Sequence, residues 1–489
     1  MLPYYLNGSM SSRCSGQALS DLMSTRRNHP KRGSFMLKHL NYGLGMFLSF
    51  CVVTESFAIG GDFIGNEAPS ARVAGQGYVG VAGVNEDPTA VFSNPGAMTS
   101  LLGTQVTFGM HWENIHGGFK DSAGNETKER VTNVAVPNFA ATQSFFDGKL
   151  SAGLSTQSQF GLETHWDDNS PMRYVATNSR LRMVDVMPAL AYQVHPKFSV
   201  GVGADYVNVF DAQLDRQVYS DGVNAALGVP TLGAADATSS LRGQAADWGY
   251  HAGLVFQPNT QNSLGLTYHS KVNLRVNGSE TLTGMSGAMS ALFGGSNYST
   301  SAYTDLVLPS NIQFGYAFKP TDKWTFEADT AWYHWSEGQD VNVRYAETNA
   351  FRLAVLNGGN PEPLTLRDCW SFNTGVNYKL SDKWQVRSGF WYEPWALPES
   401  TFNPAFMDLS RYGVSVGAGY AISEHLTIDA AYSAVFFHNR TINNSAQVNA
   451  SGIPDGTPLL SGTAESNGTY SDFANLVALN LTYRFGKGN

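Results

Sequence analysis

The feature that most constrains the fold of this chain is a strict alternation of apolar and polar residues in long segments. In NLVALNLTYRF (475–485), large apolar side chains occupy every second position, and small, polar or charged ones lie between them. The segments FSVGVGADYVNVF (198–210), RYGVSVGAGYAI (411–422) and HLTIDAAYSAVFF (425–437) repeat the pattern. Because successive side chains of a strand point to opposite faces, each segment is predicted to be a β-strand with one apolar face.

Two observations favour a membrane barrel over a soluble sheet. Many of these segments extend well beyond the roughly 5–6 residues usual for soluble strands. Aromatic residues also gather at segment ends, as Trp324 and Trp384 do in two Asp-Lys-Trp turns, which is typical of interfacial girdles. A mean hydropathy of −0.21 is compatible with a barrel, since one face of its wall is polar. We therefore predict an all-β, antiparallel transmembrane β-barrel.

Fourteen strands are expected, in keeping with the even number found in bacterial barrels. They are expected near 104–114, 133–145, 149–164, 181–195, 198–216, 241–257, 261–278, 303–319, 323–345, 364–380, 383–393, 410–421, 425–441 and 473–485. Short turns at 195–197, 258–261, 319–323 and 380–383 alternate with long connections near 217–240, 279–302, 346–363, 394–409 and 442–472. This asymmetry is expected between the periplasmic and outer faces of an outer-membrane barrel.

The N-terminal region reads as a targeting segment. Within 36–58, a short basic region precedes an apolar stretch at 44–53, and Ser56 and Ala58 match a small-x-small cleavage site. The expected organisation is an upstream extension and signal peptide at 1–58, cleaved near Ala58, an N-terminal segment at 59–102, and the barrel at 103–489. Translation could start at Met1 or Met36, and Cys51 leaves a lipoprotein reading open although the bulky Phe50 precedes it.

The composition and the motifs exclude several other classes. Only 15% of residues are charged and no basic block is present, so we expect no nucleic-acid partner. The 11 histidines are scattered, and no protease, hydrolase, P-loop or paired-cysteine motif occurs. We therefore expect no enzyme activity, no cofactor and no metal. The charged residues that the alternation places inside the barrel are expected to be solvated and mutually paired.

The order of these features resembles the FadL family of outer-membrane transporters of long-chain fatty acids and hydrocarbons. The resemblance is carried by SARVAGQGYVGVAGVNEDPTAVFSNPGAMTSL (70–101), LSTQSQFGLET (154–164), DWGYHAGLVFQPNTQNSLGLTYHSKVNLRVNG (247–278) and LPSNIQFGYAFKPTDKWTFEADTAWYHWS (308–336). It implies that residues 59–102 form a hatch inside the lumen, with Asn94, Pro95 and Gly96 as its turn motif. Glycine stands at 96 where the family has alanine.

The resemblance also implies a ligand site. A kink in the third strand would fall at Phe160 and Gly161, with Ser158 just before it, and Arg216 after the fifth strand would bind a ligand carboxylate. The lysine that the family carries before the tenth strand is absent from GGNPEPLTLRDCW (358–370), where Arg367 or Arg352 could replace it. This departure leaves aromatic-hydrocarbon transport open beside fatty-acid transport.

Two predicted outer loops, at 224–237 and 281–295, are unusually apolar. In the second loop, one face of a short helix is expected to carry five apolar residues: Leu282, Met285, Met289, Leu292 and Phe293. By the same resemblance they would form a groove that first captures ligand, because exposed apolar patches usually mark binding surfaces. The alternative is that these side chains pack only against each other.

The last strand ends with Tyr483 and Phe485, which resemble the signal read by the barrel-assembly machinery, although GKGN follows them. We expect a monomer in contact with outer-membrane lipid and lipopolysaccharide. Its expected function is passive transport of hydrophobic compounds, most of all long-chain fatty acids, with lateral exit through the wall. The alternatives are a hydrocarbon channel of the same fold, a general diffusion porin, an outer-membrane enzyme and a secreted β-sandwich array.

Overall fold

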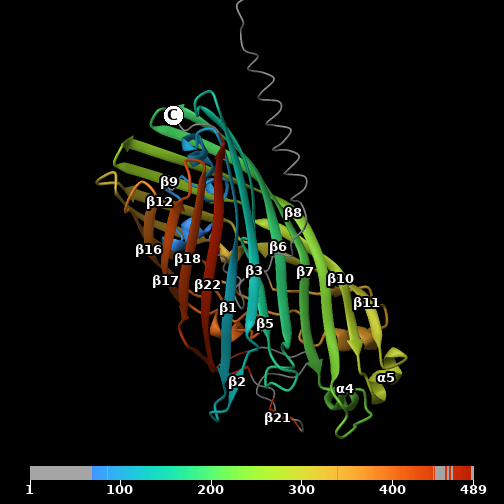
Figure 1. Cartoon of the computed structure of the whole chain (residues 1–489). Helices are drawn as coiled ribbons and strands as arrows, with labels where there is room; N and C mark the ends of the chain where they lie inside the picture. Colours follow the sequence, from blue (N-terminus) through green and yellow to red (C-terminus); the bar gives the residue numbers. More distant parts are fainter. Residues whose placement is uncertain are drawn as a thin grey trace, which may run out of the picture. The chain divides into compact units, whose positions relative to one another are not determined.

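The computed structural model (Figure 1) describes residues 69–84, 86–338, 340–443, 445, 458–459, 462–463 and 466–485. The chain divides into units 1–54 and 55–489, and every described residue belongs to the second. The predicted signal peptide, its cleavage site and residues 59–68 of the predicted hatch lie outside the described residues.

Among the described residues, twenty strands form one antiparallel sheet. They are β1 (Thr104–Lys120), β2 (Glu126–Lys128), β3 (Thr132–Phe145), β4 (Leu150–Gln157), β5 (Leu162–His165), β6 (Asn178–His195), β7 (Phe198–Val218), β8 (Ala237–Asn259), β9 (Asn262–His269), β10 (Val272–Thr283), β11 (Tyr298–Leu308), β12 (Asn311–Phe318), β13 (Trp324–Tyr333), β14 (Arg344–Tyr345), β15 (Cys369–Lys379), β16 (Trp384–Glu393), β17 (Arg411–Ala421), β18 (Leu426–Phe437), β19 (Arg440–Ile442) and β22 (Gly468–Phe485). A separate pair is formed by β20 (Pro458–Leu459) and β21 (Gly462–Thr463).

The sheet closes into a barrel of fourteen wall strands. Four of them are interrupted and consist of two strands each, namely β4 and β5, β9 and β10, β11 and β12, and β18 and β19, while β2 and β14 are short additions. Closure is made by β1 and β22, which pair from Thr104 with Phe485 to Lys120 with Thr469. A closed barrel has no strand edge with unpaired backbone groups, and a sheet that spans a lipid bilayer requires this.

The two faces of the wall confirm the membrane-barrel prediction. In β22, Val477, Leu479 and Leu481 are 43–49% exposed, whereas Asn480 and Thr482, which point to the other face, are at most 5% exposed. A soluble sheet would bury the apolar residues and expose the polar ones. Here the apolar face points outward, as contact with lipid requires. No helix among the described residues is long and apolar enough to cross a membrane.

The helices of the described residues are all short. They are α2 (Ala71–Gly75), α3 (Ala90–Ser93), α4 (Ser220–Ala226), α5 (Gly287–Phe293) and α6 (Ala350–Leu356), with 3-10 turns η1 (Pro95–Ser100), η2 (Trp335–Glu337) and η3 (Glu399–Thr401). In Figure 1, α4 and α5 lie together beyond the ends of β8, β10 and β11. The long connections that contain α4, α5 and α6 therefore lie together, in keeping with the predicted loop asymmetry.

The strand count is confirmed, and some boundaries differ. The predicted strand at 323–345 stops at Tyr333, because the chain turns into η2 there. Three interruptions were not predicted, at Ser270–Lys271, at Pro309–Ser310 and at His438–Asn439. Proline lacks the N–H that a ladder needs, which accounts for the second interruption. The interruption between Gln157 and Leu162 is the kink that the third strand was predicted to contain.

Candidate functional site

The N-terminal segment 69–102 lies against the inward face of the barrel wall. Its backbone donates hydrogen bonds to inward side chains: Asp329 accepts from Gly80 and Val81 (2.8 and 3.0 Å), and Glu327 accepts from Ala82 (3.0 Å). Inward charges were expected to be solvated and mutually paired. These two carboxylates are instead buried and accept hydrogen bonds from backbone N–H groups. They bind the irregular backbone of this segment, which would otherwise carry unsatisfied buried donors.

A buried charge cluster fixes the start of the segment. Asp429 in β18 accepts from Arg387 in β16 at 2.7 Å and from Arg72 in α2 at 3.4 Å. The three side chains are 9% exposed or less. One carboxylate therefore joins two wall strands to the N-terminal segment, and removing it would leave two buried cations without this partner.

The predicted turn motif, Asn94-Pro95-Gly96, packs against β7 and β8. The Asn94 amide donates to the carbonyls of Val81 (2.7 Å) and Leu254 (2.9 Å), and its oxygen caps η1 by accepting from the Gly96 N–H (3.0 Å). The wall has glycines opposite the motif: a Cβ at Gly253 would lie 2.2 Å from Asn94 Oδ1, and one at Gly201 would lie 2.4 Å from the Pro95 carbonyl carbon. The fit explains why small residues face each other here.

The third wall strand, which consists of β4 and β5, is incompletely paired with its neighbour β3. β3 pairs with β4 only from Phe139 to Phe145, whereas Thr132–Asn138 pair with β1 alone in the described structure. The unpaired stretch is bounded on one side by the Phe139–Thr156 pair and on the other by a hydrogen bond from Arg130 to the His165 carbonyl (3.0 Å). The interruption therefore opens a gap in the hydrogen-bond ladder between β3 and the third wall strand.

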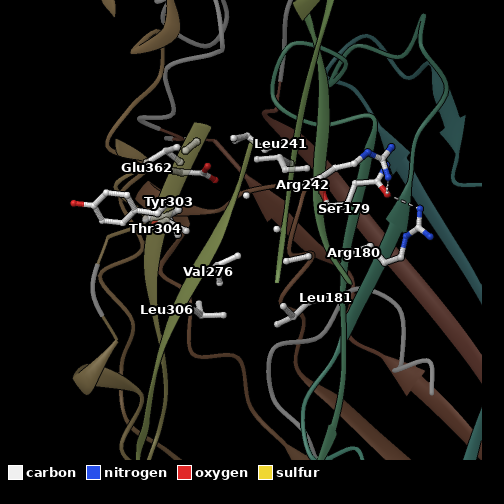
Figure 2. Close-up of a pocket in the computed structure, with 18 of the residues that line it drawn as sticks. Ser179, Arg180, Leu181, Leu241, Arg242, Val276, Tyr303, Thr304, Leu306 and Glu362 are labelled. Atoms are coloured by element: carbon white, nitrogen blue, oxygen red, sulfur yellow. Dashed lines mark hydrogen bonds between the residues drawn. The ribbon is translucent and has the colours of Figure 1, made fainter. Parts of the chain in front are cut away.

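A cavity of about 140 Å³ lies among the ends of β6, β7, β8, β10 and β11. Figure 2 shows Leu181, Val276 and Leu306 around its lower part, with Leu241 and Glu362 around its upper part. Leu162 and Phe406 also line it, and they share one apolar cluster with Phe160. Residues that line the cavity therefore belong to the same apolar cluster as Phe160 at the kink.

Arg216 is the charged residue of β7 that lines this cavity. It is 7% exposed, its Nε has no hydrogen-bond partner, and its guanidinium makes no ion pair among the described residues. Burying an arginine without a close partner is costly. Arg216 is therefore available to an anionic group that enters the cavity.

Two acids lie near enough to Arg216 to feel its charge. They are Glu362, which lines the cavity from the connection after α6, and Glu280 of β10, which accepts a hydrogen bond from Ser239 (2.7 Å). Burial raises the pKa of Glu362 to about 7, and the Arg216 cation opposes that rise. Neither acid was identified from the sequence. The short polar connection around Glu362 contained no signal for it, because its contact with Arg216 depends on how the loop folds back.

Two further arginines border the cavity without facing it. Arg180 and Arg242 turn their guanidinium groups aside in Figure 2, and the side-chain oxygen of Gln213 accepts from both, at 2.7 and 2.8 Å. Both also pair with aspartates, Arg180 with Asp211 and Arg242 with Asp215. Their charges are therefore used by neighbouring residues, in contrast to that of Arg216.

The other predicted ligand residues are dispersed. Ser158 donates to the Met183 carbonyl (3.0 Å) and does not line the cavity. Phe160 is buried and packs edge-on against Trp335, with ring centroids 5.9 Å apart. Gly161 lies in the interruption between β4 and β5. Arg367 is exposed, stacks on Trp395 and lies outside the cavity, so it does not replace the missing lysine there.

The apolar outer-loop residues form a closed cluster rather than an open groove. Leu282, Met285, Met289 and Phe293 are at most 5% exposed, and Leu292 is partly buried against them. The cluster includes residues of α4 and α6, and the helix α5 begins only at Gly287, so Leu282 and Met285 precede it. This arrangement agrees with the alternative interpretation, in which these side chains pack against each other. Tyr483 and Phe485, in contrast, lie on the outward face of β22, 41% and 46% exposed.

Three comparisons place this chain among known proteins. The profile of a family described as outer membrane protein transport protein (OMPP1/FadL/TodX) matches residues 51–485. The long-chain fatty acid transport protein of Escherichia coli O6:H1 is 23% identical over 416 residues, which cover 80% of this chain and 89% of that protein. Outer membrane protein P1 of Haemophilus influenzae is 25% identical over 454 residues, covering 84% and 92%.

Solved structures share the fold. A crystal structure of a Pseudomonas aeruginosa FadL homologue superposes with a TM-score of 0.71 at 20% identity, covering 88% of this chain and all (100%) of that one. The P. putida toluene transporter TodX superposes with a TM-score of 0.61 at 19% identity, covering 85% and 100%.

Proposed function

Because this chain belongs to the OMPP1/FadL/TodX family of outer-membrane transport proteins, we propose that it carries long-chain fatty acids, with the carboxylate bound at Arg216. Outer-membrane transport of hydrophobic compounds is the property of the family, whose members are transporters and not enzymes. Our proposal goes beyond the family assignment in two respects: the substrate is a fatty acid rather than a hydrocarbon, and it follows a stated path through the barrel. Relatives named long-chain fatty acid transport proteins support that choice.

The observation that carries the proposal is the state of Arg216. It is a buried cation in a cavity otherwise lined mainly by apolar groups, and no described residue forms an ion pair with it. An amphiphile with a carboxylate head matches this arrangement, since the head would pair with the guanidinium and the chain would lie along the apolar lining.

The path that we propose has three steps. Ligand enters from the loop end, where the closed apolar cluster around Met289 would open to receive it. It then occupies the cavity beside Arg216. It finally leaves through the gap between β3 and the third wall strand after the N-terminal segment and Phe160 have moved. Lateral exit keeps an apolar chain away from water, and the missing ladder bonds at Thr132–Asn138 lower the cost of opening the wall there.

The experiment is uptake of labelled oleate and labelled toluene by cells that lack their own transporters. Such cells would express the wild type, Arg216→Ala or Arg367→Ala, the last being an exposed arginine outside the cavity. The proposal expects oleate uptake that falls about tenfold or more in Arg216→Ala and stays unchanged in Arg367→Ala, since a charge-assisted pair contributes at least about 1.5 kcal/mol. Equal oleate uptake by all three proteins would contradict the carboxylate site.

A second candidate substrate is a single-ring aromatic hydrocarbon. The cavity of about 140 Å³ is close to the ~150 Å³ that suffices for benzene in an engineered apolar cavity. Glu280 and Glu362 also surround Arg216 with negative charge, which opposes an entering carboxylate. Toluene uptake that is indifferent to Arg216→Ala, without oleate uptake, would select this candidate. Uptake of neither compound together with leakage of small sugars would indicate a general porin.

A further inference from the structure

Three buried side chains on neighbouring strands converge inside the barrel, away from the cavity described above. Asp205 lies on β7, and His251 on β8 is the cross-strand partner of His269 on β9. One ligand atom of each lies within 4.8 Å of those of the other two. The imidazole rings stack at 5.3 Å with their planes 15° apart, so both present the same edge to the carboxylate.

The hydrogen bonds of His251 define its protonation. Its Nε2 lies 2.9 Å from the carbonyl oxygen of Val91 in the N-terminal segment. A carbonyl can only accept, so Nε2 carries a hydrogen, and a neutral imidazole has only one N–H. Its Nδ1 nevertheless contacts Asp205 Oδ1 at hydrogen-bonding distance. A lone pair facing a carboxylate is repulsive, so the contact contains a proton, and a metal ion bound here would displace that proton.

His269 repeats this arrangement. Its Nδ1 lies 4.0 Å from Asp205 Oδ2 and has no hydrogen-bond partner, although the side chain is only 4% exposed. The ring also lies beside Phe92 of the N-terminal segment, with the centroids of the Phe92 and His269 rings 5.4 Å apart. The Nδ1 atoms of both histidines therefore face the same carboxylate, and the two rings contact consecutive residues of the N-terminal segment, Val91 and Phe92.

We propose that Asp205, His251 and His269 bind a divalent transition-metal ion, of which Zn²⁺ is the natural probe, through one carboxylate oxygen and the two Nδ1 atoms. Two imidazoles and a carboxylate are ligands that Zn²⁺ takes readily. A metal-bound histidine usually donates its other N–H to a carbonyl or carboxylate, which fixes the ring, and Val91 accepts in this way from His251. Asp185 has an unpartnered buried oxygen and lies near enough to Asp205 to feel its charge, but it is not one of the three clustered ligands.

The ion would couple the wall to the N-terminal segment. Its ligands come from β7, β8 and β9, and the same rings contact α3, His251 through the Val91 carbonyl and His269 through the Phe92 ring. Bound metal would therefore stabilise the closed position of this segment, and a chelator would loosen it. The inference does not depend on the substrate, because none of the three residues lines the cavity at Arg216.

The test is metal binding by the untagged full-length protein in detergent. After stripping with EDTA, calorimetric titration with Zn²⁺ should show one tight site per chain, and Co²⁺ should give the visible absorption of a nitrogen- and oxygen-ligated ion. Substitution of outer-shell groups costs 10–100-fold in affinity, so loss of a ligand in His269→Ala or Asp205→Asn should cost about 100-fold or more. His195→Ala, at an exposed turn, should leave the affinity unchanged.

A misfolded variant would be recognised by its mobility on unheated gels, and His269→Gln, which keeps a polar side chain, serves as the milder replacement. If the wild type binds no Zn²⁺, or if folded His269→Ala or His269→Gln binds it as tightly, the metal proposal is overturned. The cation between His251 and Asp205 is then a proton.

Discussion

The side-chain amide of Asn94 donates a hydrogen bond of 2.9 Å to the backbone carbonyl of Leu254 in β8. This bond joins the N-terminal segment to the barrel wall, where Gly201 and Gly253 leave room for Asn94 and Pro95. If the segment is a hatch, weakening this contact should let it move more often.

Replacing Asn94 by alanine should raise passive conductance. The change removes donors to Val81 and Leu254 and the acceptor for the Gly96 N–H. Each buried group left unpaired costs about 1–3 kcal/mol, which weakens the closed state. Single-channel recording in planar bilayers would show more frequent openings than in the wild type. Asn277→Ala, at an exposed strand position, is the matched control, and equal conductance of the two variants would mean that the motif is an ordinary turn.

Gly253→Ala should have the same effect by a different route. The added Cβ would lie 2.2 Å from Asn94 Oδ1 and 2.8 Å from a Pro95 carbon, so the motif must shift. Gly118→Ala on β1 is the control, because its Cβ would meet its nearest neighbour at 3.4 Å, an ordinary contact. Protease sensitivity of the N-terminal segment in intact outer membranes would measure the shift. A segment as resistant in Gly253→Ala as in Gly118→Ala would argue that the packing is not tight.

Asp429→Ala should be strongly destabilising. It leaves Arg72 and Arg387 buried without their shared partner, and breaking a buried ion pair by removing one partner costs about 3–5 kcal/mol. Urea unfolding in detergent micelles would measure the loss. The exposed pair of Arg275 with Asp305, at 2.8 Å, offers a contrast: Asp305→Ala should change stability little, since solvent screens such pairs. A loss in Asp429→Ala as small as that in Asp305→Ala would show that the buried cluster contributes no more to stability than an exposed ion pair.

Fatty-acid affinity should rise as the pH falls from 8 to 6. Burial raises the pKa of Glu362 to about 7, against the opposing effect of Arg216. Below that pH the carboxyl is neutral, which frees Arg216 for a ligand carboxylate, while above it the Glu362 charge repels the ligand. Equilibrium binding of a fluorescent fatty acid at both pH values would show the change. Glu362→Gln should bind equally well at both, and a wild type without pH dependence would separate Glu362 from the ligand site.

The same shift has a consequence for stability. The carboxyl of Glu362 has an ordinary pKa of 4.5, and the folded protein holds its proton up to about 7. Between these values the unfolded chain has lost the proton that the folded chain retains, so this group lowers stability as pH rises from about 4.5 to about 7. Glu362→Gln should remove that part of the pH dependence in urea unfolding curves.

Much of the wall could be predicted because the pattern that forms it is local. Alternation between neighbours such as Leu479 and Asn480 indicates which face of a strand contacts lipid, and this prediction needs no information from other parts of the chain. The kink between Gln157 and Leu162 was instead implied by the family resemblance, and Gly161 within a strand pattern is in keeping with it. Loop positions followed from the spacing of the strands.

The interactions inside the barrel were decided by the tertiary structure. Arg216 could be named from a resemblance, but its lack of an ion pair and its position near Glu362 depend on how a distant loop folds back. The sequence contained no metal motif, because Asp205, His251 and His269 are brought together by the register of three strands and not by their spacing along the chain. Alternation determines which face a side chain occupies. Only the closed, registered barrel determines which side chains meet there.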